Sequence, residues 1–173
     1  MKIVAYEVRE DEAEIMKKLA GKLGIDELVT TAEPLTLDTV HLAEGAAGVT
    51  TLGQSIIDEK VCQALKNVGV KGYSTRTVGY NHVNLKAAAE AGIRVSNATY
   101  SPHGVAEYTV MLILMTLRNY KPALYRINVN DYSLNGLIGK ELHDMTVGII
   151  GTGKIGAAVI QNLSGFGCKL LAH

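Results

Sequence analysis

Three glycines stand at a fixed spacing near the end of this 173-residue chain. Gly151, Gly153 and Gly156 form the pattern G-x-G-x-x-G. In a turn between a strand and a helix, the first glycine allows the tight bend and the second lets the backbone approach a pyrophosphate. The third lets the helix pack closely on the strand. The start of the helix would present free N–H groups and a positive dipole end to phosphates. The pattern therefore predicts a dinucleotide-binding turn.

The segments on either side of the glycines bear on the alternative, a turn that needs glycine only for its shape. An apolar run at residues 147–150 predicts a strand directly before the turn, and residues 154–167 predict a helix directly after it. Because the dinucleotide fingerprint requires this order, we favour cofactor binding. The fingerprint also includes an acidic residue about 20 positions further on, which binds ribose. No Asp or Glu follows Gly156, so the choice between NAD and NADP stays open.

In the first hundred residues, short β-rich runs alternate with helical patterns. Strands are predicted at 2–6, 26–31, 47–52, 70–76 and 93–98, and helices at 10–24, 36–45, 58–69 and 84–92. In the first helix, Ile15, Leu19 and Leu23 recur at helical spacing. Thr36 or Asp38 is expected to cap the second helix, and Asp58 to open the third. This alternation predicts an α/β fold with a parallel, doubly wound sheet covered on both faces.

The pattern changes after Tyr100. A long apolar helix is predicted from about Ser101 to Asn119, with Pro102 near its start. We expect so apolar a helix to be buried on most of its circumference, either in a core or against another subunit. A second helix follows from about Lys121, and the polar, glycine-containing segment 131–144 is interpreted as a connector to the glycine turn.

Composition excludes several classes of protein. The chain has 17 basic and 17 acidic residues, so its zero formal charge argues against a nucleic-acid binder. No apolar run is long enough for a membrane span, and the start of the chain lacks a signal-peptide core. Cys62 and Cys168 have no metal-site spacing, so we expect no metal and two reduced thiols in a cytoplasmic protein.

Three further motifs accompany the glycine pattern. They are R-T-V-G at 76–79, Y-S-P at 100–102 and "GFGCKLLA" at 165–172. Together with "VGIIGTGKIG" they resemble the D-2-hydroxyacid dehydrogenases. Within that family the chain is most similar to the D-lactate dehydrogenases, including the type associated with vancomycin resistance. The resemblance extends over the whole chain but covers only the N-terminal half of those proteins.

The resemblance implies two domains. Residues 1–100 would form a flavodoxin-like parallel-sheet substrate domain, the catalytic domain of the family, lacking its C-terminal closing helix. Residues 101–173 would hold an interdomain helix and the first β-α-β of a Rossmann NAD-binding domain, in truncated form. The helix around 103–119 would also form a homodimer.

The resemblance also implies roles for individual residues. The backbone N–H groups of Val78 and Gly79 would bind the carboxylate of a 2-oxo acid, and Tyr100 would reach the same site. A glycine just after a parallel strand independently lies at the sheet's carboxyl edge, where such folds bind ligands. Lys154 and Ile155 would contact the pyrophosphate through their backbones, beside the three glycines of the turn.

The activity implied is that of an oxidoreductase using NAD, with NADP not excluded. It would interconvert a small, pyruvate-like 2-oxo acid and the D-2-hydroxy acid. The family's catalytic arginine, glutamate and histidine lie beyond residue 173, so no catalytic residue is assigned here. We therefore expect this chain to be inactive alone.

Two other functions could be built on such a fold. A non-enzymatic dinucleotide-binding sensor or corepressor on the same scaffold remains an alternative, because fold does not fix function. A phosphoreceiver domain at 1–100 is rejected, because the third predicted strand ends without an aspartate and the glycine turn would stay unexplained.

Several charged and titratable residues invite a catalytic interpretation. His103 is more simply a first-turn helix residue than a catalytic base, and Glu107 lies four positions on, where the two could pair. His82 carries no clearer signal. Arg76 and Arg118 are interpreted as structural charges.

Overall fold

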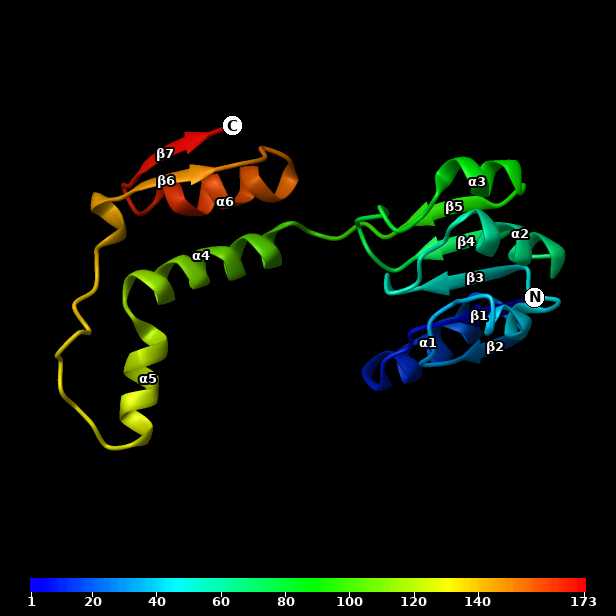
Figure 1. Ribbon diagram of the computed structural model, residues 1–173, viewed down its shortest axis with the longest axis horizontal. Helices are drawn as coiled ribbons and strands as arrows, with labels where there is room; N and C mark the ends of the chain where they lie inside the picture. The colour runs from blue at the N-terminus through cyan, green and yellow to red at the C-terminus, as the bar shows by residue number, and fades with distance from the viewer. The chain divides into compact units, whose positions relative to one another are not determined.

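A computed structural model describes residues 1–173 as two compact units, Met1–Tyr100 and Ser101–His173. Figure 1 shows the first unit as a sheet with helices packed on it. Its elements in chain order are β1 (Lys2–Ala5), α1 (Glu10–Lys22), β2 (Glu27–Thr30), a short 3-10 helix (Val40–Ala43), β3 (Gly48–Thr51), α2 (Glu59–Asn67), β4 (Gly72–Thr75), α3 (Leu85–Glu90) and β5 (Arg94–Asn97).

The five strands are all parallel and follow the spatial order β2-β1-β3-β4-β5. This is the flavodoxin-like order, so the predicted fold class is confirmed for this unit. The chain turns from one side of β1 to the other between β2 and β3, which makes the gap between β1 and β3 the topological switch point. Ligands of such sheets bind outside the carboxyl ends of the strands at this point.

The core lies on one face of the sheet. Val4, Val49 and Tyr73 stand opposite one another in the strand register and are all buried. They pack with Leu65 of α2, which is fully buried, and with small residues of α3. The alternating strand pattern therefore buries one set of side chains beneath α2, α3 and the 3-10 helix.

The other face of the sheet is partly open, which corrects the expectation that helices cover both faces. A groove crosses β1, β3, β4 and β5 there, lined by Ile3, Thr50, Ser74 and Ser96 among others. The apolar face of α1 is likewise open. Ile15 is 59% exposed and Leu23 70% exposed, although their spacing suggested a packed face. Within this unit α1 packs against β2, and no helix covers the groove over the other strands.

The predicted helix at 36–45 is also corrected. Only Val40–Ala43 are helical, as a 3-10 turn, and neither Thr36 nor Asp38 caps it. The Thr39 hydroxyl instead accepts from the Thr36 N–H at 2.9 Å and donates to the Pro34 carbonyl at 2.7 Å. This local bonding competes with a regular first helical turn, as threonine often does.

The predicted cap of α2 is confirmed. Asp58 is extended and its carboxylate accepts the N–H of Val61 at 2.9 Å. We expect Asp58→Ala to lower the free energy of unfolding by about 1 kcal/mol, because that N–H loses its only acceptor. Urea denaturation measures the change. Lys60→Ala, at an exposed position one residue inside the helix, is the control, and equal effects of the two variants would contradict the prediction.

The second unit contains α4 (His103–Leu117), α5 (Tyr120–Asn128), a 3-10 turn (Leu142–Asp144), β6 (Thr146–Ile149), α6 (Lys154–Ser164) and β7 (Lys169–Ala172). β6 and β7 pair in parallel, with α6 as their crossover. The predicted first β-α-β of a Rossmann fold is therefore present. Residues 131–141 form the expected connector without regular structure.

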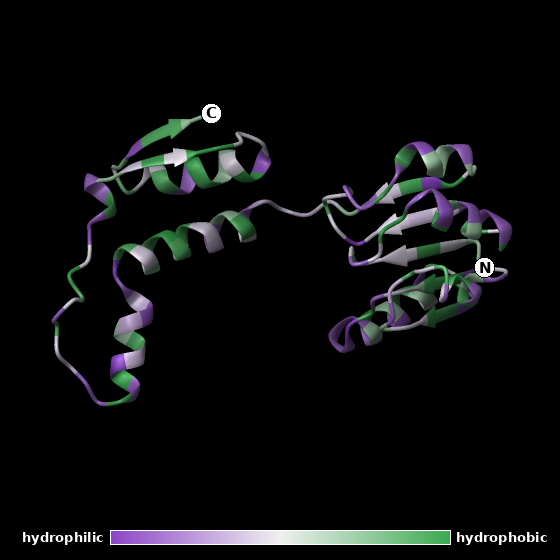
Figure 2. Cartoon of the chain, viewed as in Figure 1, coloured by the Kyte–Doolittle hydropathy of each residue, from purple (hydrophilic) through white to green (hydrophobic).

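The apolar helix α4 packs one side on α6 through Ala106 and Val110, against Val159 and Leu163. Figure 2 shows apolar residues along most of its length, yet Tyr108 on its other side is 60% exposed. The expected burial around most of the circumference is therefore not met within this unit. None of the helices combines the length and the hydrophobicity that a membrane span requires.

Candidate functional site

The strands of the first unit end at a common edge, where two turns carry the candidate residues. Figure 1 shows the arrowheads of β3, β4 and β5 ending on the same side. Thr77, Val78 and Gly79 follow β4, and Tyr100 follows β5, the neighbouring strand. The structure thus places the predicted substrate-binding residues beyond the carboxyl ends of adjacent strands.

Side chains hold the turn after β4 by donating hydrogen bonds to its backbone carbonyls. The Thr77 hydroxyl donates to the Gly79 carbonyl at 2.6 Å, and the Asn97 amide donates to the Val78 carbonyl at 2.8 Å. The N–H groups of Val78 and Gly79 donate no hydrogen bond within the chain. Val78 is 39% exposed, so water or a ligand can reach this turn. Two adjacent free donors on a fixed turn are suited to bind a carboxylate.

Tyr100 makes no hydrogen bond to this turn, but the segment that leads to it does. Two residues earlier, the Ala98 N–H donates to the carbonyls of Thr75 and Thr77 at 3.1 and 3.0 Å. The Tyr100 side chain is 59% exposed. The structure therefore leaves it free to contact a ligand without fixing its direction.

Glu7 is a feature of this edge that sequence reasoning missed. It follows β1, is only 4% exposed and has a left-handed backbone with φ +55°. Its carboxylate accepts the N–H groups of four successive residues after β3, namely Leu52 (2.7 Å), Gly53 (2.6 Å), Gln54 (3.0 Å) and Ser55 (2.6 Å). The Ser55 hydroxyl donates to it as well. The available signal was position, since Glu7 directly follows a buried strand of a parallel sheet.

Arg76 completes this buried cluster. One terminal nitrogen of its guanidinium donates to the carbonyls of Tyr6 and Glu7 at 3.0 and 2.9 Å and lies 3.5 Å from the Glu12 carboxylate. Its other two nitrogens are buried without a partner. Burial lowers the pKa of Arg76, although the carboxylates of Glu12 and Glu7 oppose that effect. Arg76 thus ties the end of β4 to the end of β1, in agreement with a structural role.

The Glu7 carboxylate makes stability depend on pH. Burial acts to raise its pKa, but the hydrogen bonds from Ser55 and from the backbone outweigh burial and leave the pKa below its ordinary value. A carboxyl whose pKa is lowered by folding stabilises the fold above its unfolded pKa of about 4.3, and that stabilisation is lost as the pH falls through the folded pKa.

We therefore expect Glu7→Gln to be less stable than the unchanged protein at pH 6, with a difference that shrinks as the pH approaches 3. Urea denaturation at both pH values measures the two free energies of unfolding. The same difference at both pH values would show that ionisation of Glu7 does not contribute.

The glycine turn of the second unit has the geometry that its pattern predicts. Gly151 follows β6 with φ +94°, a conformation that side chains strongly disfavour. Gly153 caps α6 in an extended conformation. A Cβ added at Gly156 would overlap the carbonyl oxygen of Gly151 and lie 3.1 Å from its carbonyl carbon. The third glycine is therefore required for close packing of helix on turn.

The start of α6 offers free donors. The first N–H of this helix with a backbone acceptor is that of Ala157, which donates to the Gly153 carbonyl at 2.9 Å. The N–H groups of Lys154, Ile155 and Gly156 have no acceptor in the structure and lie at the positive end of the helix dipole. Together with the glycines of the turn, which have no side chains to block a ligand, these N–H groups fit a pyrophosphate, as in dinucleotide-binding turns.

The histidines provide no catalytic arrangement. His82 Nε2 lies 3.2 Å from the Thr75 hydroxyl, a neutral partner. The pairing considered between His103 and Glu107 is not among the ion pairs of the structure, and both side chains are exposed. The chemistry that these units support is therefore binding of anionic groups by backbone N–H groups.

Comparison with known proteins identifies this arrangement. A sequence model of the catalytic domain of D-isomer specific 2-hydroxyacid dehydrogenases matches residues 3–166. The chain belongs to this family. It is 42% identical to an aromatic 2-oxoacid reductase of Clostridium sporogenes, over 98% of its length and 51% of the relative's. It is 41% identical to a D-specific alpha-keto acid dehydrogenase of Enterococcus faecium, over 99% of its length and 53% of the relative's.

Solved structures of the family agree with the fold. The apo structure of D-lactate dehydrogenase from Escherichia coli superposes with a TM-score of 0.84 at 34% identity, covering 99% of this chain and 55% of that one. An NAD-complexed 2-hydroxyacid dehydrogenase of Lactobacillus delbrueckii gives a TM-score of 0.71 at 35% identity, covering 99% and 53%. The chain spans about half the length of the relatives it matches, so the activity of a whole enzyme is a matter for proposal.

Proposed function

We propose that this chain supplies the substrate-binding unit and the dinucleotide-binding turn of an NAD(P)-dependent oxidoreductase. The substrates would be a 2-oxo acid and the corresponding D-2-hydroxy acid. Residues 1–100 are the substrate domain in this proposal, and residues 101–173 hold the interdomain helix and the first part of the NAD-binding domain. Membership of the dehydrogenase family supports this division.

The observation that carries the proposal is the free pair of N–H groups at Val78 and Gly79. The Val78 carbonyl, in the same peptide group as the Gly79 N–H, is held by Asn97 at 2.8 Å. The Thr77 carbonyl, in the same peptide group as the Val78 N–H, accepts the Ala98 N–H at 3.0 Å, so both peptide groups are held in place. A 2-oxo acid carries one carboxylate, which two converging N–H groups can bind and orient. Tyr100, exposed beyond the next strand, would contact the same substrate. In this role the turn would orient the C2 carbon of the substrate toward the nicotinamide.

The second unit would hold the cofactor. Gly151 and Gly153 would admit its pyrophosphate, Gly156 would keep α6 close, and the N–H groups of Lys154 and Ile155 would donate to the phosphate oxygens. When bound, the nicotinamide supplies hydride transfer. NAD is the cofactor we propose, supported by the NAD complex of a relative, and NADP is not excluded.

Two exposed apolar surfaces support further parts of the proposal. The open groove of the first unit, with glycines at Gly48 and Gly72, is the place where we propose that the closing helix of the substrate domain packs. The exposed side of α4, which includes Tyr108 and Leu112, is the surface through which we propose a homodimer. Sedimentation of the protein with and without Leu112→Asp tests the dimer, since a buried charge would dissociate it.

An NADH oxidation assay with pyruvate and bulkier 2-oxo acids tests the proposed activity. We expect turnover by a protein that also contains the family's catalytic residues, and none by the 173-residue chain alone. Calorimetry with NADH on the same samples separates binding from catalysis. Binding without turnover in every sample would favour the alternative of a dinucleotide sensor or corepressor, and turnover by the 173-residue chain would contradict the predicted inactivity.

A further inference from the structure

The carboxyl edge of the first unit carries two groups of backbone donors, of which one is free and the other is hydrogen-bonded within the chain. The Val78 and Gly79 N–H groups are free, whereas the four N–H groups of residues 52–55 all point to one carboxylate, that of Glu7. Both groups lie where parallel strands end, and the second lies at the switch point between β1 and β3.

The second group has the features of an anion site. Successive N–H groups that converge form a nest, a concavity that binds anions in many proteins. The four amides hold the anion at 2.6 to 3.0 Å, and the Ser55 hydroxyl also donates to it. That hydroxyl in turn accepts the Leu35 N–H at 2.8 Å. Every donor of the nest is thus satisfied by the chain itself.

We propose that residues 52–55 form a carboxylate-binding nest whose resident ligand is Glu7, and that Glu7 thereby positions the neighbouring substrate turn. The positioning part rests on the proposed function of Val78 and Gly79. The nest itself, a site for small carboxylates once Glu7 is removed, does not depend on that function.

Contacts connect the nest to the turn. The N–H of Arg76, the residue before Thr77, donates to the carbonyl of Thr51, directly before the nest, at 2.7 Å. The Arg76 guanidinium donates to the Glu7 carbonyl at 2.9 Å. Thr77 is the residue whose hydroxyl holds the Gly79 carbonyl. Glu7 therefore acts through the nest and Arg76 on the turn that carries the two donors for substrate. Because Glu7 occupies the nest, the four donors of residues 52–55 are not available to a substrate carboxylate.

The left-handed backbone at Glu7 allows a variant that removes only the side chain. Its φ of +55° suits glycine, so Glu7→Gly removes the carboxylate without creating backbone strain. We expect the Tm of Glu7→Gly to fall by about 5–10 °C, because four buried or partly buried N–H groups lose a charged acceptor. Formate, a carboxylate without a side chain, should restore at least half of that loss in a saturable way. Sodium chloride at the same ionic strength should not.

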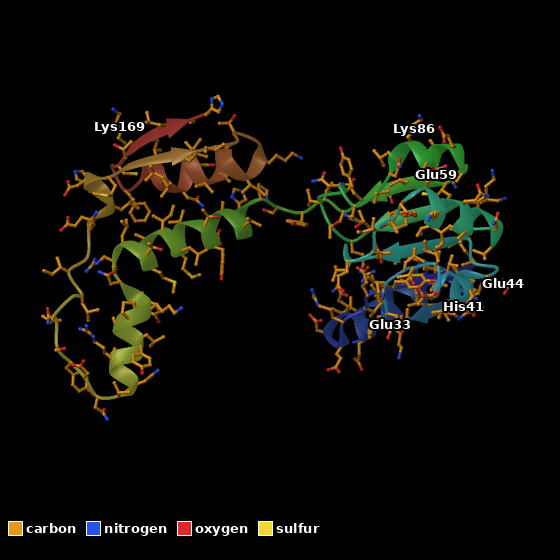
Figure 3. The ribbon with its side chains drawn as sticks, viewed as in Figure 1. Glu33, His41, Glu44, Glu59, Lys86 and Lys169 are labelled. Carbon is orange, nitrogen blue, oxygen red and sulfur yellow. The ribbon has the colours of Figure 1, made fainter.

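Amide NMR shows where formate binds. In Glu7→Gly, formate should shift the N–H resonances of residues 52–55, and the unchanged protein should show no such shifts there. Formate bound at the Val78–Gly79 turn would instead shift those two resonances in both proteins. Glu33→Gln is the control variant: Glu33 accepts the Glu7 N–H through its backbone, but its side chain is exposed at the same edge (Figure 3).

In the complete enzyme, Glu7→Gly and Glu7→Gln should each raise KM for the 2-oxo acid by about 5–10-fold with kcat changed less than two-fold, since one stabilising interaction of about 1 kcal/mol is lost. Glu7→Gln keeps the side-chain volume and serves if the glycine variant does not fold. Equal formate effects on Tm and amide shifts in both proteins would overturn the nest, and an unchanged KM would overturn the positioning role. An enzyme without 2-oxo acid turnover would overturn the proposed function and leave the formate result valid.

Discussion

Replacing Gly156 with alanine should raise the dissociation constant for NADH by about 5- to 150-fold. A Cβ at this position would overlap the Gly151 carbonyl and approach the Ile149 side chain at 3.5 Å, so turn and helix must separate. Overpacking of this kind typically costs 1–3 kcal/mol, which corresponds to this range of affinity. The free N–H groups of Lys154 and Ile155 would move with the helix and no longer converge on a phosphate. Calorimetric titration measures the change.

Gly165→Ala is the matched control for this prediction. Gly165 ends the same helix with φ −70°, and no atom lies within 4 Å of an added Cβ. We expect NADH affinity to change less than two-fold in this variant. If Gly156→Ala and Gly165→Ala bound NADH equally well, close packing at the third glycine would not be needed for binding. Thermal unfolding of both variants separates a loss of binding from a loss of folding.

Replacing Asn97 with aspartate should raise KM for the 2-oxo acid by about 30- to 900-fold. The Asn97 amide donates to the Val78 carbonyl at 2.8 Å, whereas an aspartate would place a carboxylate oxygen against that carbonyl oxygen. Loss of the hydrogen bond alone accounts for about 1 kcal/mol. The new negative charge beside the carboxylate site adds a repulsion of about 1–3 kcal/mol, depending on solvent screening. Steady-state kinetics on the complete enzyme measure this effect.

Two further variants separate the causes. Asn97→Ala removes the hydrogen bond without adding charge, and its KM should rise only about five-fold. Asn67→Asp introduces the same charge on an exposed position of α2, and its KM should be unchanged. Similar KM values for Asn97→Ala and Asn97→Asp would show that charge at this turn does not affect the substrate. That result would argue against carboxylate binding by Val78 and Gly79.

Local sequence determined the parts of this protein that depend on neighbouring residues. The turn at Gly151–Gly156 follows from glycines between an apolar strand and a helix. Gly151 has φ +94°, and a Cβ at Gly156 would overlap the Gly151 carbonyl five residues earlier. The strand and helix pattern likewise determined a parallel sheet, because side-chain periodicity of two or 3.6 residues reflects local geometry. The cap at Asp58 is another such feature, made by a carboxylate three residues before its donor.

Only the tertiary structure decided what residues far apart in the chain do together. Glu7 meets the amides of residues 52–55 across more than 40 positions, and Asn97 holds Val78 across 19. The open face beside α1 is another case: the spacing of Ile15 and Leu23 indicates a helix face that seeks burial, but not what covers it. The physical reason is that periodicity specifies which side chains share a face, whereas the order of the strands specifies which loops meet at one edge.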